Sequence, residues 1–341
     1  MLTRHPGAAG PPSGADHQPP QRPRPALPRR RALLSLAAAG LPPALLGGCA
    51  APGAAETGPA GGGRFVTTPA FASAHAAPRR VTVWLPPGYD SGTGRHRVLY
   101  MHDGQNLFDP ADAHGGQTWG VVPALLALRA AGRVAPTIVV GVWNTPLRRQ
   151  EYGPAAPLAG LPAAWRDAVY GGPALSDGYL RFLVDELKPH IDATYRTLPG
   201  AAHTRVMGSS MGGLISLYAL VQHPGVFGAA GCVSTHWPLS TQPAWITPPG
   251  DPRAAQAQQA LRDWLAERLP APGAHRLYFD HGTVNLDALY PPLQAQVDAV
   301  LAARGWQRGL HFTSRQFDGG DHNEAAWRAR VRLPLEFLLS A

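Results

Sequence analysis

The sequence predicts an α/β fold in which a mostly parallel central sheet is flanked by helices on both faces. From residue 65 onward, short β-branched runs alternate with segments of helical period, which is the pattern of repeated βαβ units. Residues 137–143 form a near-continuous apolar run, typical of a strand buried on both faces. With 45% apolar and 15% charged residues among 341, the chain can fill a large core.

Each element follows from its local pattern. The first strand ends at Pro86-Pro87-Gly88, because proline cannot donate a ladder hydrogen bond. Leucine, valine and isoleucine recur at helical spacing along 176–191, which predicts an amphipathic helix. The expected strands are 80–85, 97–101, 137–143, 204–207, 228–234, 276–280 and 311–317. The expected helices are 119–131, 176–191, 211–223, 253–269, 291–304 and 324–339.

Two stretches, 144–175 and 235–252, fit neither period and are rich in Pro, Gly and Trp. Long irregular segments in compact domains serve as lids or walls of a site, or as ordinary surface loops. Both interpretations are kept for these two stretches.

The N-terminal region has the composition of an export signal. Three arginines, 29–31, precede a short apolar run that prolines 42 and 43 interrupt, so the run does not suit a permanent membrane span. The run ends in Leu46-Gly47-Gly48-Cys49, which resembles a bacterial lipobox with Cys49 as the lipidated residue; a weak twin-arginine signal is also present. We therefore expect a signal peptide at 1–48, a flexible tether at 49–64 and one catalytic domain at 65–341, in a periplasmic or outer-membrane-anchored lipoprotein.

Charge gives no support for nucleic-acid binding. The net charge is +8, but the first 48 residues carry six Arg and one acid, or +5, which leaves +3 for the remainder. The basic balance therefore lies mostly in the leader. Two cysteines are too few for a disulfide framework or a cysteine-based zinc site. We expect no metal and no cofactor, a membrane contact through the lipid alone, and find no signal for an oligomeric state.

The clearest motif is Gly208-Ser209-Ser210-Met211-Gly212, a G-x-S-x-G match between an expected strand and an expected helix. This context is that of a nucleophile elbow, a sharp turn that presents Ser210 at a helix N-terminus. The glycines allow neighbouring backbone to approach the turn. The pattern predicts Ser210 as a nucleophile.

A serine hydroxyl needs a base, and His322 is the best candidate. It follows the last expected strand, so its loop emerges at the same sheet edge as the elbow. Among the other histidines, His102, His281 and His311 are the nearest competitors. His102 is expected to support the core or the site, and His281 precedes His322 in an unsuitable order.

The base needs a carboxylate, expected after the strand 276–280. Asp280 and Asp287 both qualify. Asp287 is preferred because it lies further beyond the strand end and can approach the histidine loop, and Asp280 remains the alternative. The order Ser210, Asp287, His322 is the order found in α/β-hydrolases.

An oxyanion hole needs two N–H donors. The backbone of Met211, directly after the nucleophile, is one candidate. The loop 102–106 follows an early strand and turns at Gly104, so the Gln105 N–H is the other.

Four segments carry a family resemblance: 100–109 (YMHDGQNLFD), 208–213 (GSSMGG), 278–287 (YFDHG followed by LD) and 320–324 (GDHNE). Through them, residues 80–340 resemble the putative esterase family of α/β-hydrolases, which includes enterochelin, feruloyl and acetylxylan esterases. Arg148-x-x-Glu151-Tyr152 is similar to a segment of the enterochelin-esterase-like members. The resemblance implies a serine hydrolase without metal, with Ser210 as nucleophile, His322 as base and Met211 as an oxyanion donor.

These observations predict a serine carboxylic-ester hydrolase that forms an acyl-enzyme. The expected partner is a small or medium ester, namely a siderophore-type, feruloyl or acetyl ester of a sugar. Candidate substrate-binding residues are Trp119, Arg148, Tyr152 and Trp237, since aromatic rings stack on sugars and arginine pairs with anions. Packing in the core or in a lid is the alternative for the aromatic residues, and a solvated surface pair with Arg149 is the alternative for Arg148. The alternatives are an acyltransferase of the same fold and a surface lipoprotein that binds its ligand without hydrolysis.

Overall fold

The computed structural model describes residues 55–57, 62–240, 242–246 and 250–340. The expected signal peptide 1–48 and the lipidation site Cys49 lie outside the described residues and stay predictions. Within the expected tether, Ala55–Thr57 forms a short strand that pairs antiparallel with the next strand at the edge of the sheet. No helix within the described ranges combines the length and the apolar character needed to cross a membrane.

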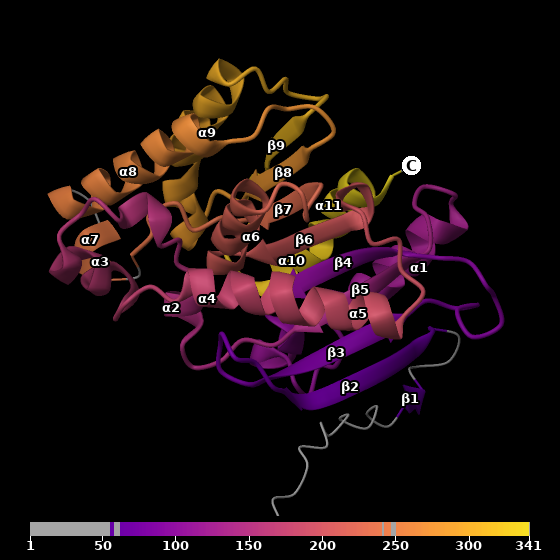
Figure 1. Cartoon of the computed structure of the whole chain (residues 1–341). Helices are drawn as coiled ribbons and strands as arrows, with labels where there is room; N and C mark the ends of the chain where they lie inside the picture. Colours follow the sequence, from indigo (N-terminus) through magenta and orange to yellow (C-terminus); the bar gives the residue numbers. More distant parts are fainter. Residues whose placement is uncertain (1–54, 58–61, 241, 247–249, 341) are drawn as a thin grey trace, which may run out of the picture. The chain divides into compact units, whose positions relative to one another are not determined.

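One sheet and its helices account for the described chain (Figure 1). Its strands are β1 (Ala55–Thr57), β2 (Arg64–Phe71), β3 (Arg79–Leu85), β4 (Arg97–His102), β5 (Thr137–Val142), β6 (Thr204–Ser209), β7 (Ala229–Val233), β8 (Arg276–His281) and β9 (Phe312–Gln316). Its α-helices are α1 (Val121–Ala130), α2 (Arg148–Tyr152), α3 (Ala163–Tyr170), α4 (Ser176–Arg181), α5 (Lys188–Thr194), α6 (Met211–Gln222), α7 (Pro243–Ile246), α8 (Pro252–Arg268), α9 (Tyr290–Ala303), α10 (Glu324–Arg330) and α11 (Arg332–Leu339).

The strand order is β1-β2-β3-β5-β4-β6-β7-β8-β9. The pairs β5–β4, β4–β6, β6–β7, β7–β8 and β8–β9 are parallel, whereas β1–β2, β2–β3 and β3–β5 are antiparallel. All six residues of β5 are buried, as the β-branched run predicted. The mostly parallel α/β architecture is therefore confirmed, and the carboxyl ends of β4, β6, β8 and β9 lie along one edge.

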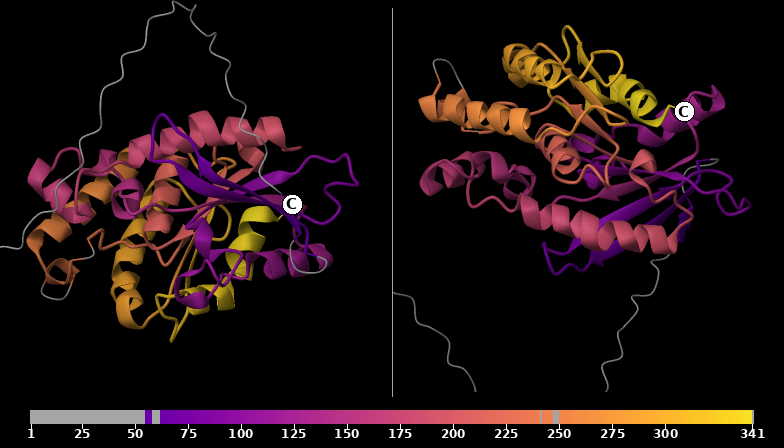
Figure 2. Two further views of the ribbon diagram at one scale, coloured as in Figure 1. Left: turned by 90° about the horizontal axis from the view of Figure 1, so that it is seen from below. Right: turned by 45° about the horizontal axis from the view of Figure 1, so that its top comes forward.

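Helices cover both faces of the sheet, as Figures 1 and 2 show. On one face the apolar side chains of α4, α5, α6, α8 and α9 form the larger core. On the other face α1, α10 and α11 cover a second apolar cluster. Both layers keep the sheet rigid, so the loops at its carboxyl edge are held in fixed positions.

Prolines account for two departures from the expected elements. Strand β2 contains Pro69, and the pairing of β2 with β3 shifts register between Thr68 and Phe71, because proline cannot donate to the ladder and introduces a bulge. The expected helix 324–339 divides into α10 and α11, since Pro334 cannot donate to the carbonyl of Arg330.

The expected helix 176–191 is longer than predicted and is not regular. It runs as α4, a π-helical stretch Phe182–Leu187, and α5. The N–H of Lys188 donates to the carbonyl of Leu183, five residues earlier. Pro189, which has no N–H, follows at once, and the widened turn accommodates it.

Candidate active site

Ser210 occupies a strained turn between β6 and α6. Its φ is 58° and its ψ is −121°, a conformation that non-glycine residues rarely adopt. A Cβ atom on Gly208 would lie 2.8 Å from the carbonyl carbon of Gly212, so only glycine permits this close crossing of the backbone. The Ser210 N–H donates to the carbonyl of Val233 at 2.9 Å, which ties the turn to β7. The turn has the geometry of a nucleophile elbow.

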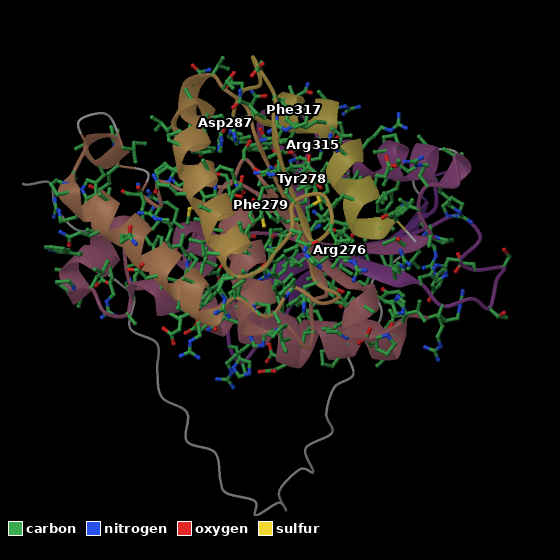
Figure 3. All side chains as sticks on the ribbon, turned by 90° about the horizontal axis from the view of Figure 1, so that it is seen from above. Arg276, Tyr278, Phe279, Asp287, Arg315 and Phe317 are labelled. Atoms are coloured by element: carbon green, nitrogen blue, oxygen red, sulfur yellow. The ribbon has the colours of Figure 1, made fainter. Side chains whose placement is uncertain are left out.

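His322 is held by Asp287. Nδ1 of His322 lies 2.6 Å from Oδ1 of Asp287. Asp287 belongs to a short 3-10 helix, Asn285–Leu289, just beyond β8, and Figure 3 shows it past the strand residues Tyr278 and Phe279. Because the carboxylate can only accept, Nδ1 carries the hydrogen and Nε2 is left as an acceptor. This tautomer is the one that accepts a proton from a hydroxyl group.

The carboxylate of Asp287 is fully buried and well supplied with donors. Its second oxygen, Oδ2, accepts from the Ser234 hydroxyl at 2.7 Å and from the Gly282 N–H at 2.6 Å. Burial opposes ionisation, but the hydrogen bonds from His322, Ser234 and Gly282 outweigh it and keep the pKa of Asp287 below its ordinary value. The group beside the imidazole is therefore a charged carboxylate at neutral pH.

Asp280, the alternative acid, points elsewhere. Its Oδ1 accepts from Nη2 of Arg330 at 3.1 Å and its Oδ2 accepts from the Tyr278 hydroxyl at 2.9 Å. Burial raises the pKa of Asp280, although Arg330 and Tyr278 counteract it. The carboxylate that contacts the imidazole is that of Asp287.

The two expected oxyanion donors lie in segments that follow β4 and β6. Met211 is the first residue of α6, so its N–H has no carbonyl one turn earlier in the helix. Gln105 lies in a short 3-10 helix, Gly104–Asn106, that follows β4, and it lines the same cavity as Ser210. A Cβ atom on Gly104 would lie 2.6 Å from the carbonyl carbon of Gly141. Glycine at this position lets the Gln105 loop rest directly on β5.

Gly104→Ala is expected to lower kcat on a short-chain ester by about 100-fold while KM changes little, because the new methyl group pushes the Gln105 N–H away from the developing oxyanion. Steady-state kinetics on the folded variant measure this. Gly94→Ala is the matched control, since no atom lies within 4 Å of a Cβ built on Gly94. A Gly104→Ala enzyme with unaltered kcat would contradict the role of this loop.

Ser210 and His322 line one cavity of about 560 Å³. Apart from Trp327, its lining residues are of polar types. The lining residues are Asp103, Gln105, Asn106, His114, Asn144, Arg148, Ser209, Ser210, His322, Asn323, Glu324 and Trp327.

Several of these wall residues were missed in the sequence, although they flank the motifs. Asn106 joins the two sides of the cavity, because its Nδ2 donates to Oε1 of Glu324 at 3.3 Å and its Oδ1 accepts from the N–H of His114 at 2.9 Å. Asn323 caps α10 by accepting from the N–H of Ala326. Only their positions in the sequence could have indicated these residues: Asn106 and Asn144 follow strands β4 and β5, and Asn323 follows His322.

Arg148 does line the cavity, but its charge is already neutralised. Nε and Nη2 of Arg148 donate to the two carboxylate oxygens of Asp103, each at 2.7 Å. Asn144 donates to the same carboxylate at 2.6 Å. Burial opposes the charge on Asp103, yet Arg148 and Asn144 lower its pKa overall. Arg148 therefore lies on the cavity wall with its guanidinium in a bidentate ion pair within the protein, and a contact between Arg148 and a substrate stays a prediction.

The three aromatic candidates for substrate binding are buried and lie outside the cavity lining. Trp119 is 2% exposed and packs against Trp327, with ring centroids 5.5 Å apart. Tyr152 is fully buried, and its hydroxyl accepts from the N–H of Asp103 at 3.3 Å. Trp237 is 2% exposed and donates to Gln294 at 2.8 Å. The prediction fails for all three because large rings bury apolar area in the core.

The competing histidines are not placed to act on Ser210. Burial lowers the pKa of His102 to about 3, so the ring stays neutral, and its Nδ1 contacts the Tyr179 hydroxyl at 2.8 Å. His281 donates from Nδ1 to the carbonyl of Gly282 at 2.7 Å. His311 accepts from the N–H of Gln307 at 3.1 Å, beyond α9.

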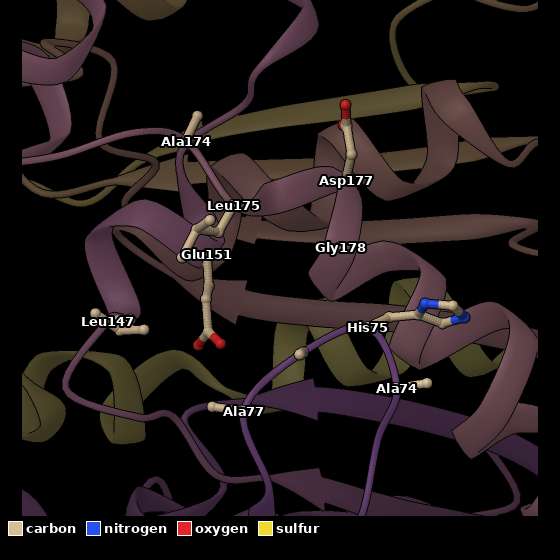
Figure 4. Close-up of a pocket in the computed structure, with 10 residues that line it drawn as sticks. Ala74, His75, Ala77, Leu147, Glu151, Ala174, Leu175, Asp177 and Gly178 are labelled. Atoms are coloured by element: carbon tan, nitrogen blue, oxygen red, sulfur yellow. The ribbon is translucent and has the colours of Figure 1, made fainter.

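A second hollow of about 460 Å³ lies on the other side of α2 (Figure 4). Its lining is mainly alanine and leucine, and it includes the exposed side chains Leu147 and Leu175. Glu151 and Asp177 also border it, but the Glu151 carboxylate is paired with Arg79 at 2.6 Å, and the Asp177 carboxylate accepts from the Tyr218 hydroxyl at 2.5 Å. The hollow contains neither Ser210 nor His322, so the chemistry belongs to the polar cavity. In the described part of the chain, no group of three or more His, Cys, Asp or Glu side chains is arranged to hold a metal ion.

Together, the parallel sheet, the strained serine turn and the His–Asp pair at the carboxyl edge define an α/β-hydrolase. Comparison with solved structures agrees on the fold. A ferulic acid esterase has a TM-score of 0.59 and 20% identity, covering 82% of this chain and 99% of that one. An IroE-like serine hydrolase from Shewanella oneidensis has a TM-score of 0.57 and 17% identity, covering 80% and 78%. The enterobactin esterase from Shigella flexneri, solved with 2,3-dihydroxy-N-benzoyl-glycine, has a TM-score of 0.55 and 20% identity, covering 82% and 60%.

Residues 73–334 match the family model described as putative esterase. The chain belongs to this family, which is a family of serine ester hydrolases, and the resemblance seen in the sequence is confirmed. The uncharacterized protein YbbA of Bacillus subtilis (strain 168) is 28% identical over 163 residues. That match spans 48% of this chain and 59% of YbbA.

Proposed function

We propose that the protein hydrolyses carboxylic esters with Ser210 as nucleophile, His322 as general base and Asp287 as the supporting acid. The observation that carries the proposal is the 2.6 Å hydrogen bond between Asp287 and His322, on a cavity that the strained Ser210 also lines. These three side chains come from separate loops at one edge of the sheet, which is the arrangement that acyl transfer requires.

In the first half-reaction, Nε2 of His322 takes the proton of the Ser210 hydroxyl as Oγ attacks the ester carbonyl carbon. The N–H groups of Met211 and Gln105 donate to the oxyanion that forms, and Asp287 stabilises the imidazolium. Collapse of the intermediate breaks the ester C–O bond, and Nε2–H protonates the departing alcohol. Water then attacks the acyl-enzyme by the same steps, which releases the carboxylic acid and restores Ser210.

The cavity favours a neutral ester with several hydroxyl groups. Its wall offers the amides of Gln105, Asn106, Asn144 and Asn323, which supply both donors and acceptors to hydroxyl groups. The guanidinium that lines it, that of Arg148, is engaged by Asp103. A catecholate siderophore is negatively charged when it holds iron, and it would then bring that charge toward Glu324 without a matching cation from Arg148. An acetyl or feruloyl ester of a sugar therefore fits better than a catecholate.

An ester panel tests this preference. We expect kcat/KM for acetyl and feruloyl esters of a sugar to exceed that for an iron-bound catecholate ester of serine by about tenfold or more, because the bound catecholate brings negative charge toward Glu324 while Arg148 is paired with Asp103. Product analysis with added sugar acceptor separates hydrolysis from acyl transfer. A preference for the catecholate would contradict the assignment, and tight binding without turnover would favour a non-catalytic ligand-binding protein.

A further inference from the structure

A buried polar network lies directly behind the His322–Asp287 pair. Asp280 at the end of β8, Arg330 at the end of α10 and Ser234 just after β7 are all 5% exposed or less. None of the three lines the cavity with Ser210. Charged side chains are rarely buried in this way unless they are paired.

The Ser234 hydroxyl links this network to Asp287. Its Oγ accepts from Nη2 of Arg330 at 2.7 Å and from Nε1 of Trp327 at 3.0 Å. Both of those groups can only donate, so the hydroxyl hydrogen points to Oδ2 of Asp287, 2.7 Å away. Ser234 has a φ of 40°, a strained conformation that the surrounding contacts must hold in place.

Arg330 lies between two carboxylates. Its Nη2 is 3.1 Å from Asp280 and 3.9 Å from Asp287. While His322 is neutral, the charges of Arg330, Asp280 and Asp287 sum to −1. Once His322 accepts a proton, these three charges and the imidazolium sum to zero. Asp280 thus offsets Arg330, and the charge of Asp287 is left to stabilise the imidazolium.

We propose that Arg330 and Ser234 are positioning residues that orient the acid Asp287, and that Asp280 is the counter-charge which prevents Arg330 from opposing protonation of His322. This inference rests on the proposed function, since it assigns Asp287 to the reaction. It adds a buried electrostatic element that sets the pH range of activity.

Several other titratable groups and rings face His322 and Asp287. Burial lowers the pKa of His236 to about 4, so it is neutral in the working range. Arg148 is paired with Asp103 across the cavity, and Asp321 accepts from the His322 N–H and from Asn323. The remaining groups are the Tyr290 hydroxyl, 3.5 Å from Nδ1 of His322, the Glu324 carboxylate on the cavity wall and the Trp327 ring. None of these groups contacts both Arg330 and Asp287. Substitutions at Asp280 and Arg330 therefore change the charge of the network without changing these other groups.

The test is the pH profile of kcat/KM on a short-chain ester in folded variants. Asp280→Asn leaves Arg330 without its counter-charge, so protonation of His322 becomes harder. The acidic midpoint of the profile should move to lower pH by about half a unit to one unit. Asp280→Asn combined with Arg330→Met removes both charges, and the midpoint should return to that of the parent enzyme. An unmoved or raised midpoint in Asp280→Asn would overturn the proposal.

Ser234→Ala supplies a second arm that does not depend on a buried charge. Loss of its hydroxyl frees one side of the Asp287 carboxylate, so kcat should fall about tenfold at unchanged KM. Unchanged kcat in this variant would also overturn the proposal. Ser210→Ala distinguishes the two proposals. If this variant is inactive and the pH profiles do not move, the proposal for the network is wrong and the ester-hydrolase assignment stands. If Ser210→Ala is active, the ester-hydrolase assignment itself is wrong.

Discussion

Ser210→Ala is expected to lower kcat/KM on a short-chain ester by about 10⁵-fold, because removal of the nucleophile leaves only binding and the oxyanion donors. Single-turnover kinetics with a nitrophenyl ester measure the loss, and a fluorophosphonate probe should label the parent enzyme at this residue alone. Ser209 also lines the cavity with His322, but the strained backbone of the turn before α6 is at Ser210.

The neighbouring hydroxyl gives a matched control. Ser209 is the last residue of β6 and is 3% exposed, so Ser209→Ala should retain more than about a tenth of the activity. Stability gives a second readout. Ser210→Gly relieves the positive φ that Ser210→Ala retains, and should be more stable to urea by about 1 kcal/mol. Substantial ester turnover in either Ser210 variant would contradict the nucleophile assignment.

The parallel part of the fold could be predicted because its signals are local. The buried run at 137–143 and the spacing along 176–191 report directly on the environment of each side chain. Strand β2 could not be found in the same way, since Pro69 interrupts its alternation and only pairing with β3 makes it a strand. The π-helical stretch before Pro189 is likewise a response of the whole helix to one missing N–H group.

The candidate catalytic residues could be proposed because backbone geometry demands particular residue types there. The elbow needs glycine at 208, and a base after the last parallel strand reaches the same edge as the elbow. The wall of the cavity could not be predicted from type alone. Arginine is a residue type that binds anions, and only the structure shows that the guanidinium of Arg148 is paired with the Asp103 carboxylate. Tyr152 is close in sequence to Arg148 yet is buried.

Asp287→Asn is expected to lower kcat by about 10³–10⁴-fold through the tautomer of His322. The Asn oxygen will face the Ser234 hydroxyl and the Gly282 N–H, because that side of the site offers two donors, whereas His322 offers only one on the other side. The amide NH₂ group is then turned toward Nδ1 of His322, which must become the acceptor. The ring hydrogen moves to Nε2, so that nitrogen cannot take the proton of Ser210. Steady-state kinetics between pH 6 and 9 measure the loss, and circular dichroism checks the fold.

Two comparisons separate this effect from a general loss of charge. Asp318→Asn removes an exposed carboxylate in the same loop as His322, and should leave kcat within about threefold of the parent value because exposed charges interact weakly. Asp287→Ala removes the amide that imposes the wrong tautomer, so His322 can again carry its hydrogen on Nδ1, and kcat should exceed that of Asp287→Asn. An Asp287→Asn enzyme with at least a tenth of the parent kcat would mean that the imidazole draws its orientation from another group, and the Tyr290 hydroxyl, 3.5 Å from Nδ1, would then be the residue to replace.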